Sequence, residues 1–517
     1  MCFVESHITK VHTHFTLQQF AEQSEGEVIV DPSAIMSAIG SPFFPTAVEI
    51  VTRAIDHDNA GEYEKALPLY DQALEWFLKG LKLEKDPAAK EAVEKRVTSY
   101  MARAETLKKL IRKDAATSAG SGSGGVASAL PAFELEKYFA LHEFSAKYLL
   151  GCSDAESIQM KYLLSLADEE CKQLWDDLEL GYTESRGFPL LNAEIAQLYK
   201  ACHGTHVLGF AGAEEGIYAT MKAILTKSPH DHCIVITPCY QSLKAIPASL
   251  CPNMSCLDLC LEDNWSLDID ALTALVIPGQ TKLIVMNFPH NPTGSVLPRK
   301  TLDAVINLCR RNGIWLFSDE VYRGIERDPQ DLNPPVVSLY EKGISLGVMS
   351  KAYGLAGLRI GWIVCTDMNM LDEISNVKHY LSICNSCSSE VLALIALRNA
   401  NTILGRNIAI TKENLQHINE FFENWKGCFS WVEPKGGCCG YVRYLLKGKM
   451  TLAELADVLI TKYNILIIPG DMFPTAAMDG ERDGIDSKNH FRLGFGRSNF
   501  KEALDALCAA LREILVT

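Results

Sequence analysis

The chain has 517 residues, and 49 basic against 64 acidic side chains give it a formal net charge of −15. Its 48% hydrophobic and 22% charged residues are typical of a globular protein and exclude a mainly disordered or fibrous chain. No basic run and no apolar window of about 18 residues occurs, so we expect neither a nucleic-acid partner nor a transmembrane segment.

The N-terminal part of the chain predicts a small helical bundle. Residues 1–44 match no pattern and stay unassigned. In residues 45–115, apolar side chains recur at helical spacing in TAVEIVTRAI, YEKALPLYDQALEWFLKGL and AVEKRVTSYMARAETLKKLI. Gly61 and the corner Lys85-Asp86-Pro87 separate these three segments. The pattern predicts three amphipathic helices with no catalytic residues.

The phrase HDNAGEYEKALPLYDQALEWFLKGLKLE, followed by YMARAETLKKLI, resembles a microtubule-interacting-and-transport (MIT) domain. That resemblance implies a groove between the second and third helices that binds the C-terminal helices of ESCRT-III proteins, and hence an association with endosomes. It places Met101 and Glu105 on the groove wall as partner-binding residues. A tetratricopeptide unit fits the same spacing, but no second copy follows at a period of about 34 residues. Pro68 interrupts the helical pattern in either case.

A linker follows the bundle at residues 116–130. Residues 116–128, ATSAGSGSGGVAS, are small, polar or glycine, which is typical of a flexible coil between domains. A phosphate-binding loop at Gly120 to Gly125 is the alternative. It lacks the Lys-Ser/Thr pair and the preceding strand that such a loop requires.

Residues 131–517 alternate short apolar runs with helical segments, which predicts an α/β domain with a mostly parallel sheet. Polar or aromatic residues follow five predicted strands. These residues are Ala213 and Glu214 after HVLGF, Tyr240 after HCIVITP, Asn291 after TKLIVMNF, Asp319 after IWLFS, and Lys351 after ISLGVMS. Ligands of open α/β sheets bind at the carboxyl ends of strands, so we expect the binding site there.

This set of side chains suits pyridoxal phosphate. The cofactor requires a lysine for a Schiff base and a carboxylate for its pyridine nitrogen. Its phosphate requires a helix N-terminus and an arginine. SKAYGLAGLRIGW supplies Lys351 and Arg359 with glycines that allow tight turns.

Three blocks, NFPHNPTG, FSDEVYRGI and SKAYGLAGLRIGW, resemble signature blocks of class I/II aminotransferases, which have the fold type I of pyridoxal-phosphate enzymes. The resemblance covers residues 131–517. It implies a large subdomain with a mostly parallel sheet at about residues 175–410. A smaller α+β subdomain would comprise residues 131–174 and 411–517.

The resemblance also implies roles for the cofactor-binding residues. Lys351 forms the Schiff base and moves the proton between the substrate Cα and the cofactor. Asp319 pairs with the pyridine nitrogen, and Asn291 and Tyr322 bind the phenolic oxygen. Tyr240 stacks on the ring.

The remaining assignments concern the phosphate, the substrate and a second subunit. The backbone of Ala213 and Glu214, the Ser350 hydroxyl and Arg359 hold the phosphate. Tyr182 reaches the cofactor of a neighbouring subunit, which implies a homodimer. Arg492 binds the substrate α-carboxylate.

Several alternatives concern single residues. Arg497 is the other candidate for the carboxylate-binding arginine, and His290 is expected to be structural. Val348 departs from the family pattern, because a hydroxyl residue often stands there and helps to bind the phosphate.

The 17 cysteines are scattered, and no signal peptide precedes them, which indicates reduced thiols in the cytoplasm. Cys384 and Cys387 form one C-x₂-C pair, whereas zinc needs a second converging pair. The pair lies in HYLSICNSCSSEVLALIAL, an apolar stretch that predicts a buried helix. We therefore expect no metal site.

The expected activity is transfer of an amino group between an α-amino acid and a 2-oxo acid by a cytoplasmic enzyme. A pyridoxal-phosphate-dependent lyase or cyclase acting on an amino acid is the alternative reaction, because related enzymes share the same residues. An inactive scaffold that carries the MIT-like bundle is the alternative from another class. The sequence does not name the amino donor.

Overall fold

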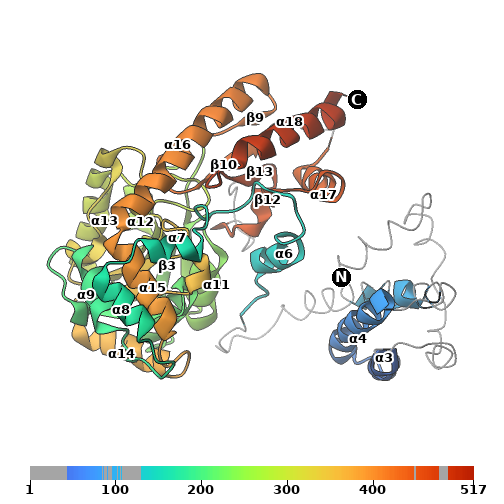
Figure 1. Cartoon of the computed structure of the whole chain (residues 1–517), viewed down its shortest axis with the longest axis horizontal. Helices are drawn as coiled ribbons and strands as arrows, with labels where there is room; N and C mark the ends of the chain where they lie inside the picture. Colours follow the sequence, from blue (N-terminus) through green and yellow to red (C-terminus); the bar gives the residue numbers. More distant parts are fainter. Residues whose placement is uncertain are drawn as a thin grey trace. The chain divides into compact units, whose positions relative to one another are not determined.

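The computed structural model describes residues 44–83, 86, 90, 93, 96–101, 103, 104, 106, 107, 130–446, 450–476 and 487–516 (Figure 1). The chain divides into two compact units, Met1–Gly124 and Gly125–Thr517. No helix in these ranges is long and apolar enough to cross a membrane.

The first unit is helical, as predicted. It contains α3 (Phe44–Asn59) and α4 (Tyr63–Leu83), joined by a turn in which Gly61 has a φ of +74°. The described residues between 90 and 107 are also helical. Apolar side chains from all three segments form one buried core. Pro68 lies inside α4 without ending it.

A polar cluster lies within this core. The Asp58 side chain is buried, and its carboxylate accepts hydrogen bonds of 2.8 Å from both Nε and Nη2 of Arg103. The Tyr70 hydroxyl donates to the same carboxylate at 3.1 Å. These three side chains satisfy one another, so the cluster ties α3 to α4 and to the third helical segment.

The second unit is built on a seven-stranded sheet with the order β2-β8-β7-β6-β5-β3-β4. Its strands are β2 (Val207–Phe210), β3 (His232–Thr237), β4 (Asn253–Asp258), β5 (Thr281–Asn287), β6 (Trp315–Asp319), β7 (Gly343–Val348) and β8 (Gly361–Cys365). Only β8 runs antiparallel to its neighbours in this sheet. The predicted mostly parallel sheet is confirmed.

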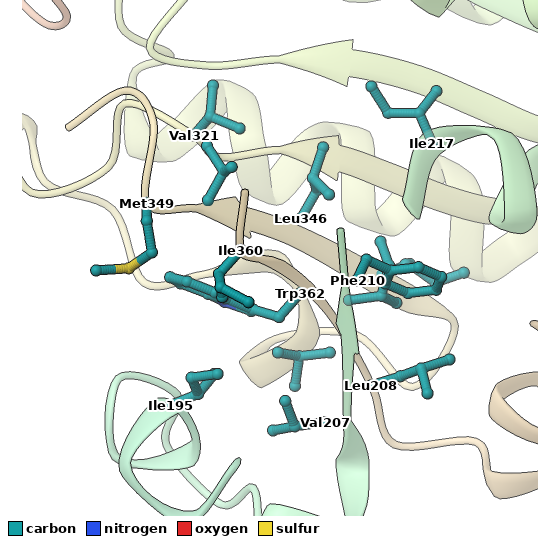
Figure 2. Close-up of a cluster of buried hydrophobic side chains, with 14 of the residues drawn as sticks. Ile195, Val207, Leu208, Phe210, Ile217, Val321, Leu346, Met349, Ile360 and Trp362 are labelled. Atoms are coloured by element: carbon teal, nitrogen blue, oxygen red, sulfur yellow. The ribbon is translucent and has the colours of Figure 1, made fainter. Parts of the chain in front are cut away.

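Helices cover both faces of this sheet. Alternate strand residues point to opposite sides, so each face carries its own apolar side chains, which the helices bury. Cys233 and Val235 of β3 belong to one buried cluster, whereas Ile234 and Ile236 belong to the other. The first cluster, part of which Figure 2 shows around Trp362, takes residues from α7 (Met160–Ser165), α8 (Glu169–Asp176), α9 (Pro189–Gln197), α10 (Ala213–Leu225), α11 (Gln241–Leu250), α14 (Met368–His379) and α15 (Cys387–Arg398). The second takes residues from α6 (Glu134–His142), α12 (Ile269–Ala274) and α13 (Arg299–Asn312).

A smaller layer follows in the C-terminal part. A four-stranded sheet has the order β12-β13-β10-β9, and β1 pairs with β11 in parallel. Its elements are β1 (Tyr148–Leu149), α16 (Ala400–Asn424), β9 (Phe429–Ser430), β10 (Cys439–Tyr444), α17 (Leu452–Tyr463), β11 (Ile465–Leu466), β12 (Ile468–Pro469), β13 (His490–Gly494) and α18 (Phe500–Val516). In Figure 1, α16, α17 and α18 gather around these strands, and they share a third buried cluster.

Short 3-10 helices complete the second unit at Gly204–His206, Pro329–Asp331, Val336–Ser338, Ala356–Leu358, Gly470–Met472 and Ser487–Asn489.

The apolar stretch around Cys384 is not one buried helix, so that prediction is wrong. Helix α14 ends at His379 and α15 begins at Cys387, with turns between them. The Ser382 amide donates to Glu215 Oε1 at 2.9 Å, and the Asn385 side chain donates to Glu390 Oε1 at 2.9 Å. The Ser382 bond to a distant segment and the Asn385 bond to the start of α15 hold these residues out of a continuous helix, and Tyr380 is 87% exposed.

Candidate functional site

The carboxyl ends of β5 and β6 lie side by side, because Asn287 and Asp319 are paired in the sheet register. The Asn287 side chain donates to the backbone carbonyl of Asp319 at 2.9 Å. Its Oδ1 accepts a hydrogen bond of 2.8 Å from the backbone N–H of Asn291. Asn287 therefore fixes the loop that carries Asn291 to the strand that carries Asp319.

The Asp319 carboxyl is buried, with 5% exposure. Oδ1 accepts a hydrogen bond of 3.2 Å from the Val321 amide. Burial raises the pKa of Asp319 to about 7, although this amide and the charge of Lys351 oppose the shift. At neutral pH this carboxyl is therefore partly protonated, and a cationic ligand beside it would favour its ionised form.

Lys351 lies in the turn after β7 and is partly buried. Its Nζ donates to Ser153 Oγ at 3.1 Å, and Ser153 is only 6% exposed. Tyr322 is also buried, and its hydroxyl has no well-formed hydrogen bond within the described residues. Burial raises the pKa of Tyr322 well above its usual range. An amine and a phenol are thus held in a largely enclosed site.

A helix N-terminus and an arginine form another side of the site. Ala213 and Glu214 begin α10, and Gly212 precedes them with a φ of +101°. A Cβ at Gly212 would lie 2.5 Å from Nη2 of Arg359, so only glycine lets this guanidinium approach the helix end. The Glu214 carboxyl accepts a hydrogen bond of 3.0 Å from Ser242, and burial raises its pKa to about 7. The amide groups and guanidinium together suit a phosphate.

Arg492 on β13 is 1% exposed. Nε and Nη2 donate to the Gly151 carbonyl at 3.0 and 2.8 Å, and Nη1 donates to Asn291 Oδ1 at 3.1 Å. Arg492 forms no ion pair within the described ranges, so its buried charge is available to an anion. Arg497, in contrast, is paired with Asp154 at 2.9 Å.

Helix α6 packs against the site through aromatic and polar contacts. The Tyr240 hydroxyl donates to Glu136 Oε1 at 2.9 Å, and the rings of Tyr240 and Phe133 lie 5.3 Å apart. The Phe139 ring centroid lies 5.8 Å from Cζ of Arg492. Residues that precede β1 thus contact both Tyr240 and Arg492.

Other predicted residues lie as follows. Ser350 is partly buried beside Lys351, and Val348 is buried in β7. His290 is 1% exposed with Nδ1 2.8 Å from Thr293 Oγ1, and burial lowers its pKa to about 3. Nε2 has no well-formed hydrogen bond within the described residues, and the structural role of His290 stays a prediction.

Three predicted residues remain, which are Tyr182, Met101 and Glu105. Tyr182 is 92% exposed and makes almost no contact within its own chain. Met101 is 9% exposed within the core of the bundle, and Glu105 lies outside the described residues. The described part of the chain holds no group of three metal-binding side chains, and Cys384 and Cys387 are free thiols.

Sequence reasoning missed Ser153, Gly151 and Asn287. Asn287 ends a predicted strand, so the rule that flagged the other strand-end residues could have found it. Ser153 and Gly151 follow the short strand β1 and carry no comparable signal. Their contacts with Lys351 and Arg492 depend on pairing across the whole domain.

Comparisons with known proteins agree with this geometry. The family model for aminotransferase class I and II matches residues 164–511, and the model for the MIT (microtubule interacting and transport) domain matches residues 45–109. Capreomycidine synthase from Streptomyces vinaceus is 27% identical over 68% of this chain and 89% of its own length. Arginine–pyruvate transaminase from Pseudomonas aeruginosa is 26% identical over 64% of this chain and 82% of its own. A crystal structure of a PLP-dependent aminotransferase from Streptococcus suis is 28% identical, covers 75% of this chain and 99% of its own, and has a TM-score of 0.67.

Proposed function

This chain belongs to the aminotransferase class I and II family, and from that premise we propose that it moves an amino group between an α-amino acid and a 2-oxo acid. The family and its structural neighbours imply pyridoxal phosphate as the cofactor. The observation that carries the proposal is the placement of Lys351 near the buried Asp319 carboxyl, with Arg492 linked to the same strand ends through Asn291.

The described residues fit this cofactor. Gly212 leaves room for Arg359 at the start of α10, where a phosphate would bind. The buried Tyr322 hydroxyl has no well-formed hydrogen bond within the described residues, so it can donate to a phenolic oxygen. Asp319, with a pKa of about 7, would ionise beside a protonated ring nitrogen.

Pyridoxal phosphate, when bound, supplies an aldehyde for the Lys351 amine and an electron sink for the substrate Cα. In our proposal Asp319 holds the ring nitrogen, and Asn291 and Tyr322 bind the phenolic oxygen. Tyr240 covers the ring. The Lys351 amine, once released, moves the proton at the substrate Cα.

Two further sets of residues hold the phosphate and the substrate. Ala213 and Glu214, through their backbone amides, bind the phosphate with Ser350 and Arg359. Arg492 binds the substrate α-carboxylate, because its buried charge has no carboxylate partner within the described residues.

A homodimer is part of the proposal. Leu180, Tyr182 and Tyr380 are each at least 86% exposed. Thr183 Oγ1 donates to the Asn385 carbonyl at 3.1 Å, which joins the two segments that carry these side chains. A second copy would cover this apolar surface and receive Tyr182 at its cofactor site. Light scattering of the purified protein tests this directly, and a monomer at micromolar concentration would contradict it.

A cyclisation or elimination reaction is the second candidate, favoured by the similarity to capreomycidine synthase. The arginine–pyruvate transaminase relative favours transfer to an oxo acid. The two outcomes share the residues above and differ in whether the substrate nitrogen is transferred to a second 2-oxo acid.

The MIT domain suggests a protein partner for the first unit. We propose that it binds the C-terminal tail of an ESCRT-III protein and brings a cytoplasmic enzyme to endosomes, with Met101 and Glu105 contributing to the groove. Fluorescence anisotropy of labelled tail peptides should show saturable binding to the full chain. Failure to saturate would remove recruitment from the proposal.

The activity is tested by giving the cofactor-loaded protein single amino acids. One of them should yield its 2-oxo acid in proportion to the enzyme, and a second 2-oxo acid should restore the cofactor spectrum. Lys351→Ala should lower turnover by about 10³-fold or more. Product formed without nitrogen transfer would favour the second candidate, and no reaction with any amino acid would favour the inactive scaffold.

A further inference from the structure

We propose that the substrate of this site is an α-amino acid with a positively charged side chain, which Glu136 and Glu143 recognise. The inference rests on the proposed function and adds the chemical class of the amino donor. It concerns the face of α6 that packs against the site.

Helix α6 has a fixed orientation. Leu135 is 1% exposed and anchors the helix in the second buried cluster. Phe133 packs on Tyr240, and Phe139 packs on the guanidinium of Arg492. The helix face that carries Phe139 therefore looks toward the arginine that we assign to the substrate carboxylate.

Glu136 and Glu143 share this face. They stand three residues before and four residues after Phe139, and such spacings place side chains on one side of a helix. Glu143 caps α6 with φ −58° and ψ −42°, so the helical direction continues through it. The Tyr240 hydroxyl donates to Oε1 of Glu136 at 2.9 Å, and Oε2 accepts no hydrogen bond within the described residues, so it can accept one from a ligand.

Neither carboxylate has a basic partner in an ion pair within the described ranges. Glu134, on the same helix, differs because it lies 3.7 Å from Lys137. Burial and the charge of Asp154 raise the pKa of Glu143, and the charges of Arg497 and Lys351 oppose that shift. Glu136 is exposed and Glu143 is partly buried. Two carboxylates that form no ion pair within the described ranges favour a cation beside the site and repel an acidic side chain.

The site is a ligand site on independent grounds. Tyr322 is 1% exposed, and its hydroxyl lacks a well-formed hydrogen bond within the described residues. The Arg492 guanidinium is equally buried and contacts α6 through Phe139. A substrate held at Arg492 by its carboxylate would therefore lie beside α6.

Arginine and citrulline provide a matched pair of probes, because they have nearly the same shape and differ in the charge of the terminal group. We expect kcat/KM for arginine to exceed that for citrulline by about 10- to 100-fold, the range for hydrogen bonds to charged groups. Lysine and norleucine form a second pair. Binding without turnover is measured in the Lys351→Ala variant, as the rise in melting temperature that each amino acid causes.

Glu136→Gln and Glu143→Gln should each reduce the preference for arginine over citrulline, and the double variant should abolish it. Glu134→Gln is the matched control on the same helix and should keep the preference. Unchanged melting temperatures of the unliganded variants exclude loss of fold. A preference that survives in the double variant would overturn the assignment of these residues.

The outcomes separate this inference from the proposed function. If citrulline reacts as well as arginine, the charge preference is wrong and the aminotransferase proposal stands. If glutamate is preferred over both, the inference is also wrong. If no amino acid reacts, the proposed function fails and this inference fails with it.

Discussion

The two units of the chain treat buried polar groups in opposite ways. In the helical bundle, Asp58, Tyr70 and Arg103 bind one another within the core. In the second unit, Asp319 is buried with one amide donor, and the Tyr322 hydroxyl has no well-formed partner within the described residues.

This difference separates buried polar groups that stabilise the fold from buried polar groups that bind a ligand. A buried polar group without a partner destabilises the folded chain, because it has lost its hydrogen bonds to water. A cluster that satisfies itself needs no ligand and stabilises the fold. A group that stays unsatisfied is explained by a ligand that completes it. Substitutions in the bundle cluster should therefore lower the stability of the fold. Substitutions in the site should lower turnover without lowering stability.

The largest effect should come from Asp319. Its ordinary pKa is 3.8, and burial raises it to about 7 in the folded protein. Between these values the folded chain holds a proton that the unfolded chain has lost, so the free energy of unfolding falls as pH rises from about 4 to about 7. The full loss is about 4 kcal/mol, and none is added above pH 7.

Asp319→Asn should remove this loss from the cofactor-free protein, so the variant should be more stable than the wild type at pH 8. The same variant, loaded with cofactor, should turn over about 100-fold more slowly because the ring nitrogen loses its ionic partner. Denaturant unfolding at pH 5 and pH 8 measures the first effect. If the free energy of unfolding depended on pH in the same way in both proteins, the raised pKa of this carboxyl would be contradicted.

Asp58→Ala should have the next largest effect, confined to the bundle. It removes the acceptor of two Arg103 bonds and leaves the Tyr70 hydroxyl unpaired in the core, at a cost of about 3 kcal/mol. Calorimetry should show a lowered bundle transition with turnover unchanged. Asp56→Ala is the control, because Asp56 is an exposed residue of the same helix. An equal effect of both variants would show that the buried cluster contributes nothing special.

The same contrast explains what the sequence could predict. Asn291, Asp319 and Lys351 follow apolar strands, and parallel strands bring their carboxyl ends to one edge, so local pattern and topology placed them together. The helices of the bundle also followed from periodicity alone.

The substrate side of the site was less accessible to sequence reasoning. Ser153 and Glu136 reach the site through contacts between segments far apart in the chain, and neither lies at a strand end. The break between α14 and α15 was missed for a related reason, because the Ser382 amide binds Glu215, which lies far away in the sequence.

A substitution of Ser153 should have the smallest effect on turnover. It also gives the sharpest test of the contrast between polar residues of the site and those of the bundle core. Its hydroxyl accepts from Nζ of Lys351, so we regard it as a positioning residue that orients the amine. Ser153→Ala should lower kcat by about 10-fold, because one hydrogen bond of roughly 1.4 kcal/mol is lost, and should leave KM unchanged. Ser153→Thr keeps the hydroxyl and should recover most of the rate. A matching fall in melting temperature, or no rescue by threonine, would assign Ser153 to packing like the residues of the bundle core.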